Sequence, residues 1–196
     1  MTKGRLEAFS DGVLAVIITI MVLELVAPHE PNLEAIRRLT PGLLSYVLSY
    51  IFIGIYWSNH HHLLQAVRHV DGRILWANLH LLFWLSLVPF TTAWMGDTHF
   101  APLPVAAYGG VLLMAAIAYS LLVLALLARP GNRATLEAAL GSDFKGKISI
   151  VCYLVAVALA LRWPFAACGL YVVVAIMWLV PDRRIERTLH MDEDEE

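Results

Sequence analysis

Six long apolar segments, each about as long as a membrane-crossing helix, constrain this chain more than any other feature. A bilayer core of roughly 30 Å needs about 20 residues of helix, and prolines and glycines mark the gaps between the segments, as in "APHEP" and "RPGN". The chain of 196 residues is 59% hydrophobic, whereas soluble domains are about 45–50% apolar. We therefore predict an all-α integral membrane protein with six transmembrane helices, at residues 9–26, 41–60, 74–95, 103–127, 148–162 and 164–180.

The gaps predict a single membrane domain with two short surface helices. "NLEAIRRL", after the first segment, predicts a short helix at the membrane surface that Asn32 caps. "TLEAAL", at residues 135–140, predicts a second such turn. The fifth and sixth segments have almost no linker between them and should form a tight hairpin. We expect one six-helix domain over residues 1–190, followed by an acidic disordered tail at residues 191–196.

The distribution of charge predicts how the chain lies in a cell membrane. Of the 14 Lys and Arg residues, all but Arg37, Arg38 and Arg162 fall on the side of the N-terminus. Because cytoplasmic loops carry the excess of Lys and Arg, both termini are expected in the cytoplasm. The 14 basic residues are nearly balanced by 16 acidic ones, which argues against a nucleic acid partner.

Several motifs of enzymes, metal sites and other channels are absent from the sequence. It has no glycine-rich phosphate loop, no Ser/His/Asp set and no HExxH or CxxC spacing, so we predict neither an enzyme nor a metal site. It has no "TVGYG" filter and no Arg-rich helix that would sense voltage. Cys152 and Cys168 lie in apolar runs and are interpreted as small buried hydrophobic residues.

The first apolar segment has two chemically different faces. One is a stripe of residues that lie on or beside a shared direction at 100° per residue: Val16, Thr19, Ile20 and Leu23. Ser10 and Asp11 point roughly 120–140° away from Val16, so the polar pair and the stripe line different surfaces. Periodicity alone does not decide whether the stripe faces lipid, a packed core or a pore.

Asp11 is an ionisable residue at membrane depth and needs a partner inside the helix bundle. The candidate partners are Arg5, Asn59, His60, His61, His62, Asn78 and His80. The run "WSNHHH" resembles a metal site, but adjacent histidines on a helix point about 100° apart and do not all reach one ion. We therefore predict a hydrogen-bonded structural cluster, in which the roles of His60 and His62 stay open.

Two further residues of the first segment keep alternative interpretations. Glu24, near its far end, is either a simple interfacial acid or a member of an acidic ring at a cation entrance. The hydroxyl of Thr19 either faces an ion or bonds back to the carbonyl of Ala15.

Three motifs together resemble a known family. "RLEAFSDG" at residues 5–12, "YVLSYIFIGIYWSNHH" at 46–61 and "NLHLLFWLSLVPFTT" at 78–92 are similar to the first three helices of the endosomal and lysosomal potassium channel family, transmembrane protein 175, in its bacterial form. The last three apolar segments match that family in number, length and position.

The resemblance implies a homotetramer of six-helix subunits around a central pore that the first helix lines. Val16 and Leu23 would form apolar layers and Thr19 a hydroxyl layer, although helical geometry leaves Ile20 as close to the axis. Val16 is smaller than the family's usual residue, so the neck could be wider or gated at Leu23. The residues implied to brace the first helix against the second and third are Arg5, Phe9, Ser10, Asp11, Trp57, Asn59, His61 and Asn78.

These observations lead to one expected function and two alternatives. We expect a cation channel that conducts K⁺ in preference to Na⁺, needs no cofactor, and has as partners its own copies, monovalent cations and the lipid bilayer. The first alternative is a proton-coupled secondary transporter that uses Asp11 and the histidines of the second segment. The second alternative is a membrane scaffold without transport activity.

Overall fold

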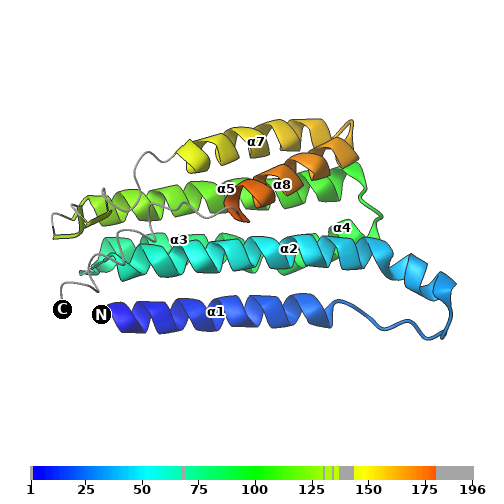
Figure 1. The fold of residues 1–196 in the computed structure, drawn as a ribbon, viewed down its shortest axis with the longest axis horizontal. Coiled ribbons are helices and arrows are strands. Elements are labelled where there is room, and N and C mark those ends of the chain that lie inside the picture. The colour runs from blue at the N-terminus through cyan, green and yellow to red at the C-terminus, as the bar shows by residue number, and fades with distance from the viewer. Residues whose placement is uncertain (1, 68, 130, 134, 137–143, 180–196) are drawn as a thin grey trace.

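The computed structural model describes the whole chain except residues 1, 68, 130, 134, 137–143 and 180–196. Within the described part, the chain forms helices joined by turns, with no strand. The helices are α1 (Lys3–Leu23), α2 (Leu33–Gln65), α3 (Gly72–Ser86), α4 (Val88–Asp97), α5 (Pro102–Leu127), α7 (Phe144–Ala160) and α8 (Pro164–Leu179). They run roughly side by side along the long axis of the molecule (Figure 1).

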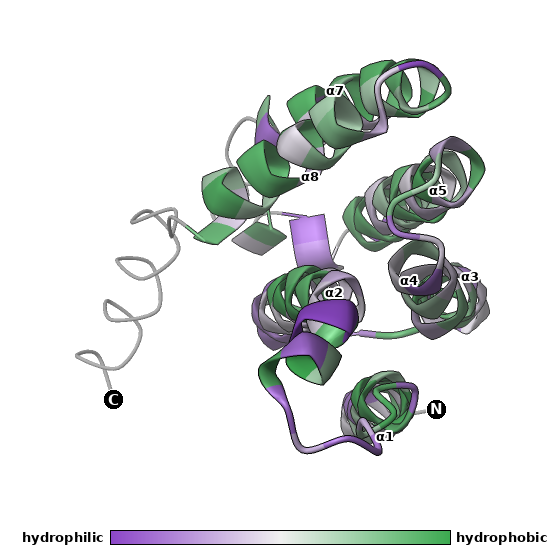
Figure 2. Cartoon of the chain, turned by 90° about the vertical axis from the view of Figure 1, so that its right-hand side faces the viewer, coloured by the Kyte–Doolittle hydropathy of each residue, from purple (hydrophilic) through white to green (hydrophobic). Residues whose placement is uncertain are grey.

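The helices stack so that α1 and the α7–α8 pair lie on opposite sides of the bundle (Figure 2). Helix α1 packs against α2, α3 and α4, and α5 packs against α3, α4 and α7. Helix α8 contacts α7, α5 and α2. The first helix is therefore held from one side only, by the middle of the bundle.

Within the described residues, four helical regions are long and apolar enough to cross a membrane: Lys3–Leu23, Leu33–Gln65, Gly72–Asp97 and Pro102–Leu127. Helices α7 and α8 are shorter, with 17 and 16 residues. They form the expected tight hairpin, because α7 ends at Ala160 and α8 begins at Pro164. The protein is thus an all-helical membrane protein, as its hydropathy predicts.

Helix α2 is longer than the sequence predicts. The expected surface helix is not separate but is the first part of α2, which begins at Leu33 and continues through Pro41. The expected cap is present, since Asn32 Oδ1 accepts the backbone N–H of Ala35 at 2.8 Å. Most of the second expected surface turn lies outside the described residues, although Thr135 and Leu136 are helical. The acidic tail also lies outside them.

The third apolar segment is divided into α3 and α4 at Leu87. Pro89 stands in the first turn of α4, where its missing N–H has no intrahelical role. The two pieces still form one apolar region from Gly72 to Asp97. The break thus changes the helix without removing the membrane crossing.

Candidate functional site

Helix α1 buries one face and leaves the other exposed. Its buried side chains follow a helical spacing and face α2, α3 and α4: Leu6, Ser10, Leu14, Ile17 and Met21. The opposite face has exposed fractions of 55% at Val16, 42% at Ile20 and 77% at Leu23. Glu24, the C-cap residue, is also exposed. An apolar face of this kind needs lipid or another protein surface to cover it.

Thr19 lies exposed beside this apolar stripe. Its hydroxyl donates a hydrogen bond to the carbonyl of Val16, with 2.8 Å between the oxygens. The acceptor is therefore Val16 and not Ala15, the acceptor considered from the sequence. A hydroxyl oxygen has two acceptor lone pairs besides its donor, so this bond leaves Thr19 Oγ1 able to face a cation.

A buried chain of hydrogen bonds joins α1 to α3 and α2. The Ser10 hydroxyl donates to the carbonyl of Leu6 at 2.8 Å and accepts the Nδ2–H of Asn78 at 3.0 Å. Asn78 Oδ1 lies 2.6 Å from His60 Nε2. Since a carbonyl oxygen only accepts, Nε2 of His60 carries the proton. The exposed fractions of Ser10, His60 and Asn78 are 3% or less, so the chain replaces water for three buried polar groups.

A second contact between α1 and α2 lies at the surface. The indole N–H of Trp57 donates to Asp11 Oδ1 at 3.0 Å. The Trp57 ring stacks on His61, with 5.8 Å between the ring centroids. His61 Nε2 in turn lies 3.0 Å from Gln65 Nε2. Asp11 is exposed, and its hydrogen-bond partner is the neutral indole of Trp57 at the surface rather than a buried cation.

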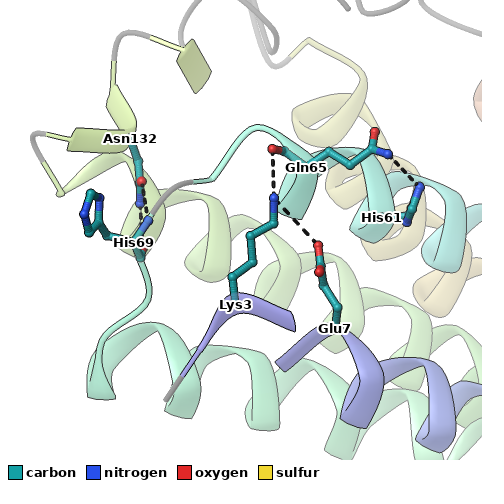
Figure 3. A network of polar contacts seen from close by, with 6 residues as sticks. All are labelled: Lys3, Glu7, His61, Gln65, His69 and Asn132. Carbon is teal, nitrogen blue, oxygen red and sulfur yellow. Dashed lines mark hydrogen bonds and ion pairs between the residues drawn. The ribbon is translucent and has the colours of Figure 1, made fainter. Parts of the chain in front are cut away.

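The end of the bundle at which α1 begins is fastened by further polar contacts (Figure 3). Lys3 Nζ donates to the carbonyl of Gln65 at 3.0 Å and lies 3.9 Å from Glu7 Oε1. Asn132 bonds both the N–H and the carbonyl of His69, at 3.1 and 3.0 Å. These contacts tie the end of α2 to α1 and to the segment after α5.

The resemblance implies that Arg5 and Phe9 help to brace α1. Within this single chain, neither residue takes part in the hydrogen bonds that join α1 to α2 and α3. Both are exposed, Phe9 at 48%. The side chain of Arg5 has no hydrogen bond or ion pair with any residue that the structure describes. The physical reason is helical phase, because both residues lie within about 20° of Val16 around α1. They share the exposed face.

On α2, the buried network uses His60, whose role the sequence leaves open, while His61, which the resemblance implies as a brace, lies in the surface contact with Trp57. His61 and His62 are exposed neighbours, with 5.7 Å between their rings. Asn59 donates to Ile55 of its own helix, and its carbonyl accepts the Tyr119 hydroxyl. A signal for His60 exists in the sequence: it stands seven residues after Ile53 and three before Leu63, both buried, and so shares their face.

Comparison with known proteins places the chain in a family. The family model for the endosomal/lysosomal potassium channel TMEM175 matches residues 5–89. A potassium channel of a Chryseobacterium species is 53% identical over 189 residues, which cover 96% of this chain and 98% of that protein. The chain belongs to the TMEM175 family. This confirms the resemblance inferred from "RLEAFSDG", and TMEM175 relatives are named as channels, not as enzymes.

Other TMEM175 relatives extend the comparison. The crystal structure of a lysosomal potassium-selective channel TMEM175 homolog from Chamaesiphon minutus superposes with a TM-score of 0.77 at 30% identity, covering 91% of this chain and 96% of that one. The chicken endosomal/lysosomal proton channel TMEM175 is 35% identical over 79 residues, which is 34% of this chain and 16% of that protein. The family thus includes members named for potassium and members named for protons.

Proposed function

We propose that this protein is a homotetrameric potassium channel of the cell membrane whose central pore is lined by α1. The observation that carries the proposal is that α1 has two different faces. One face is anchored by the buried hydrogen bonds of Ser10, Asn78 and His60, and the other exposes an apolar stripe. Four copies of such a stripe, facing one axis, would make a narrow apolar neck. Such a neck controls ion passage by resisting hydration.

Within this neck, Val16 and Leu23 form the constrictions and Thr19 the oxygen layer between them. The bond from Thr19 to the Val16 carbonyl supports this assignment, because it directs the hydrogen to the backbone and leaves oxygen lone pairs for a partly dehydrated K⁺. Ile20 is the competing residue for the axis, since its side chain is exposed at 42%. Glu24 lies at the far end of the stripe, where a ring of acids would attract cations.

We further propose six membrane crossings and cytoplasmic termini. The α7–α8 hairpin supports this, because α8 turns the chain back toward the end of the bundle where α1 begins (Figure 1). An even number of crossings requires both ends on one side. The excess of Lys and Arg at that end supports a cytoplasmic location for it.

A proton-coupled transporter remains the alternative, and one observation favours it. Asp11, Trp57, His61 and Gln65 form a contact line along the surface of α1 and α2. Aspartate and histidine are residue types that relay protons in transporters, and here Asp11 and His61 contact the same Trp57 ring. An animal relative is named as a proton channel, which also supports a role for protons.

Reconstitution of the purified protein into planar bilayers tests the proposal. A channel gives discrete single-channel current steps, and with K⁺ and Na⁺ on opposite sides the reversal potential moves toward the K⁺ equilibrium potential. Light scattering in detergent should give the mass of four chains. Currents without discrete steps that require a proton gradient would favour the transporter.

A further inference from the structure

A partly open cavity lies between helices of the subunit, on the side of α2 away from α1. Helices α2, α5, α7 and α8 line it, and its volume is about 40 Å³. It sits toward the end of the bundle at which α1 begins, since Gly146 near the start of α7 and Trp178 near the end of α8 both line it (Figure 1). None of the residues assigned to the pore lines this cavity.

Most polar side chains around the cavity already have protein partners. Ser149 accepts the indole N–H of Trp178 at 2.9 Å and donates to the carbonyl of Lys145 at 2.8 Å. Ser120 donates to a carbonyl of its own helix, α5, at 3.0 Å. The Tyr119 hydroxyl donates to the carbonyl of Asn59 at 3.3 Å. These groups therefore shape the wall and have no need of a further partner.

Two phenol hydroxyls differ from the others. Among the described residues, neither Tyr56 on α2 nor Tyr153 on α7 has a side-chain hydrogen-bond partner, and both residues line the cavity. Tyr153 as a whole is only 3% exposed. No fully occluded side-chain polar atom in the described part lacks a partner, so the Tyr153 hydroxyl is not fully occluded.

Phe52, Ile55 and Ala116 form an apolar part of the remaining wall, which also includes Asn59. About 40 Å³ holds roughly three water-sized groups at about 10–15 Å³ each. Water would bond to the two phenols and to other waters, but it would leave the apolar part of the wall without dispersion contacts. An occupant with one hydroxyl and a short carbon chain suits both the two phenols and the apolar wall.

We propose that this cavity binds a small alcohol, a molecule with a single hydroxyl on a two- or three-carbon chain, whose hydroxyl bonds to Tyr56 and Tyr153. The methylene groups lie against Phe52, Ile55 and Ala116. A ligand of about four heavy atoms binds no tighter than about tens of micromolar even at the highest known ligand efficiency, so we expect a dissociation constant in about the high-micromolar to millimolar range. The site is independent of the proposed pore, so binding does not require that the protein conduct ions.

The indole of Trp178 in the cavity wall provides a direct readout. We would titrate the intact protein in detergent with 2-bromoethanol, whose bromine quenches tryptophan fluorescence on contact. The signal of Trp178 is the difference between the wild-type protein and Trp178→Phe. We expect a saturable component in the wild-type protein that is absent from Trp178→Phe. Trp163, in the α7–α8 turn and 59% exposed, should contribute only linear quenching.

A hydroxyl-deletion variant tests the chemistry. Tyr56→Phe/Tyr153→Phe removes both hydroxyls and keeps the rings, so it should fold, as its elution volume checks, and should weaken 2-bromoethanol binding at least tenfold. Ala116→Leu fills the cavity and should abolish the saturable component. Bromoethane, which lacks the hydroxyl, should bind the wild-type protein weakly. Linear quenching of the wild-type protein, or equal affinity for 2-bromoethanol in the double variant, would overturn the proposal, as would saturable bromoethane binding of equal strength.

Discussion

At the scale of single residues, Thr19 decides between two origins of ion preference. Thr19→Val keeps the shape of the side chain and deletes the oxygen. If the oxygens of four copies contact the ion, the reversal potential under a K⁺/Na⁺ gradient should move toward zero, because nothing then replaces the lost water of K⁺. Thr19→Ser, which keeps the hydroxyl, should retain K⁺ preference. An unchanged reversal potential in Thr19→Val would make Ile20 the better candidate for the axis.

Asn78 is the central residue of the buried hydrogen-bond chain, because it bonds both Ser10 and His60. Asn78→Ala would leave the buried Nε2–H of His60 unpaired, which costs about 1–3 kcal/mol. It would also remove one of the two hydrogen bonds of the Ser10 hydroxyl, which still donates to the carbonyl of Leu6. We expect a fall of several degrees in the melting temperature, measured by light scattering or fluorescence in detergent.

Asp11→Ala is the comparison for Asn78→Ala. Asp11 is exposed and bonds only the indole of Trp57 among the described residues, so its loss should cost less than that of Asn78. A larger loss of stability in Asp11→Ala would place the main anchor of α1 at the surface contact.

At the scale of helices, a glycine pair in α5 offers a matched test of packing. A Cβ on Gly109 would collide with the hydroxyl of Tyr171 and lie 2.8 Å from its Cζ, whereas a Cβ on Gly110 would meet nothing within 4 Å. Gly109→Ala must displace Tyr171 from the Val105 carbonyl, which its hydroxyl bonds at 3.0 Å. We expect Gly109→Ala to destabilise the protein by about 1–3 kcal/mol. Gly110→Ala should be neutral or stabilising in the same thermal unfolding assay.

The start of α3 should respond to acid. The Ile74 N–H, which Asp71 Oδ1 accepts at 3.0 Å, lowers the pKa of the Asp71 carboxyl, and the Arg129 guanidinium, 2.8 Å from Oδ2, lowers it further. Because the folded pKa is below the unfolded value of about 3.9, the stabilisation is complete above that value and is lost as pH falls through the folded pKa. Asp71→Ala should therefore lower the melting temperature at pH 7 and flatten its decline below pH 4.

Asp71→Asn gives the control for that pH dependence. The amide oxygen still caps α3, but it neither titrates nor pairs with Arg129 as an ion. It should be more stable than Asp71→Ala at neutral pH while showing the same flattened acid decline. If both variants decline with pH as the wild-type protein does, another group controls the acid response.

Hydropathy predicts the positions of the helices well but not their continuity. The predicted segment at residues 103–127 is one residue shorter than α5, because an uninterrupted apolar run is a strong signal. Pro41 was expected to begin a helix, yet α2 passes through it. Next to Pro41, Gly42 in α2 lies against Gly96 in α4, where an added Cβ on Gly96 would come within 2.7 Å of Gly42 Cα. Sequence periodicity contains no information on that contact.

At the scale of the whole molecule, periodicity predicts the two different faces of α1, but it does not predict which residues α1 contacts. The 100° step predicts that Ser10 and Val16 face apart, as they do. Which of three consecutive histidines meets Asn78 depends on the rotation of α2 against α3, and the structure selects His60. Arg5 is assigned to the support by the resemblance, while the helical phase of a single chain leaves it exposed.

The exposed stripe of α1 also predicts which surface of the subunit faces the other subunits of the proposed tetramer. In a background with Cys152→Ala and Cys168→Ala, Leu23→Cys would place a thiol on the stripe, where Leu23 is 77% exposed. If four stripes face one axis, these thiols lie close enough for Cd²⁺ to bridge them, so Cd²⁺ should block the current and oxidation should give cross-linked dimers. Leu154→Cys, on α7 at 54% exposure, is the matched control and should do neither, because α7 lies on the side of the bundle opposite α1 (Figure 2). Cross-linking at residue 154 but not at 23 would place the subunit interface on α7 and turn the stripe of α1 toward lipid.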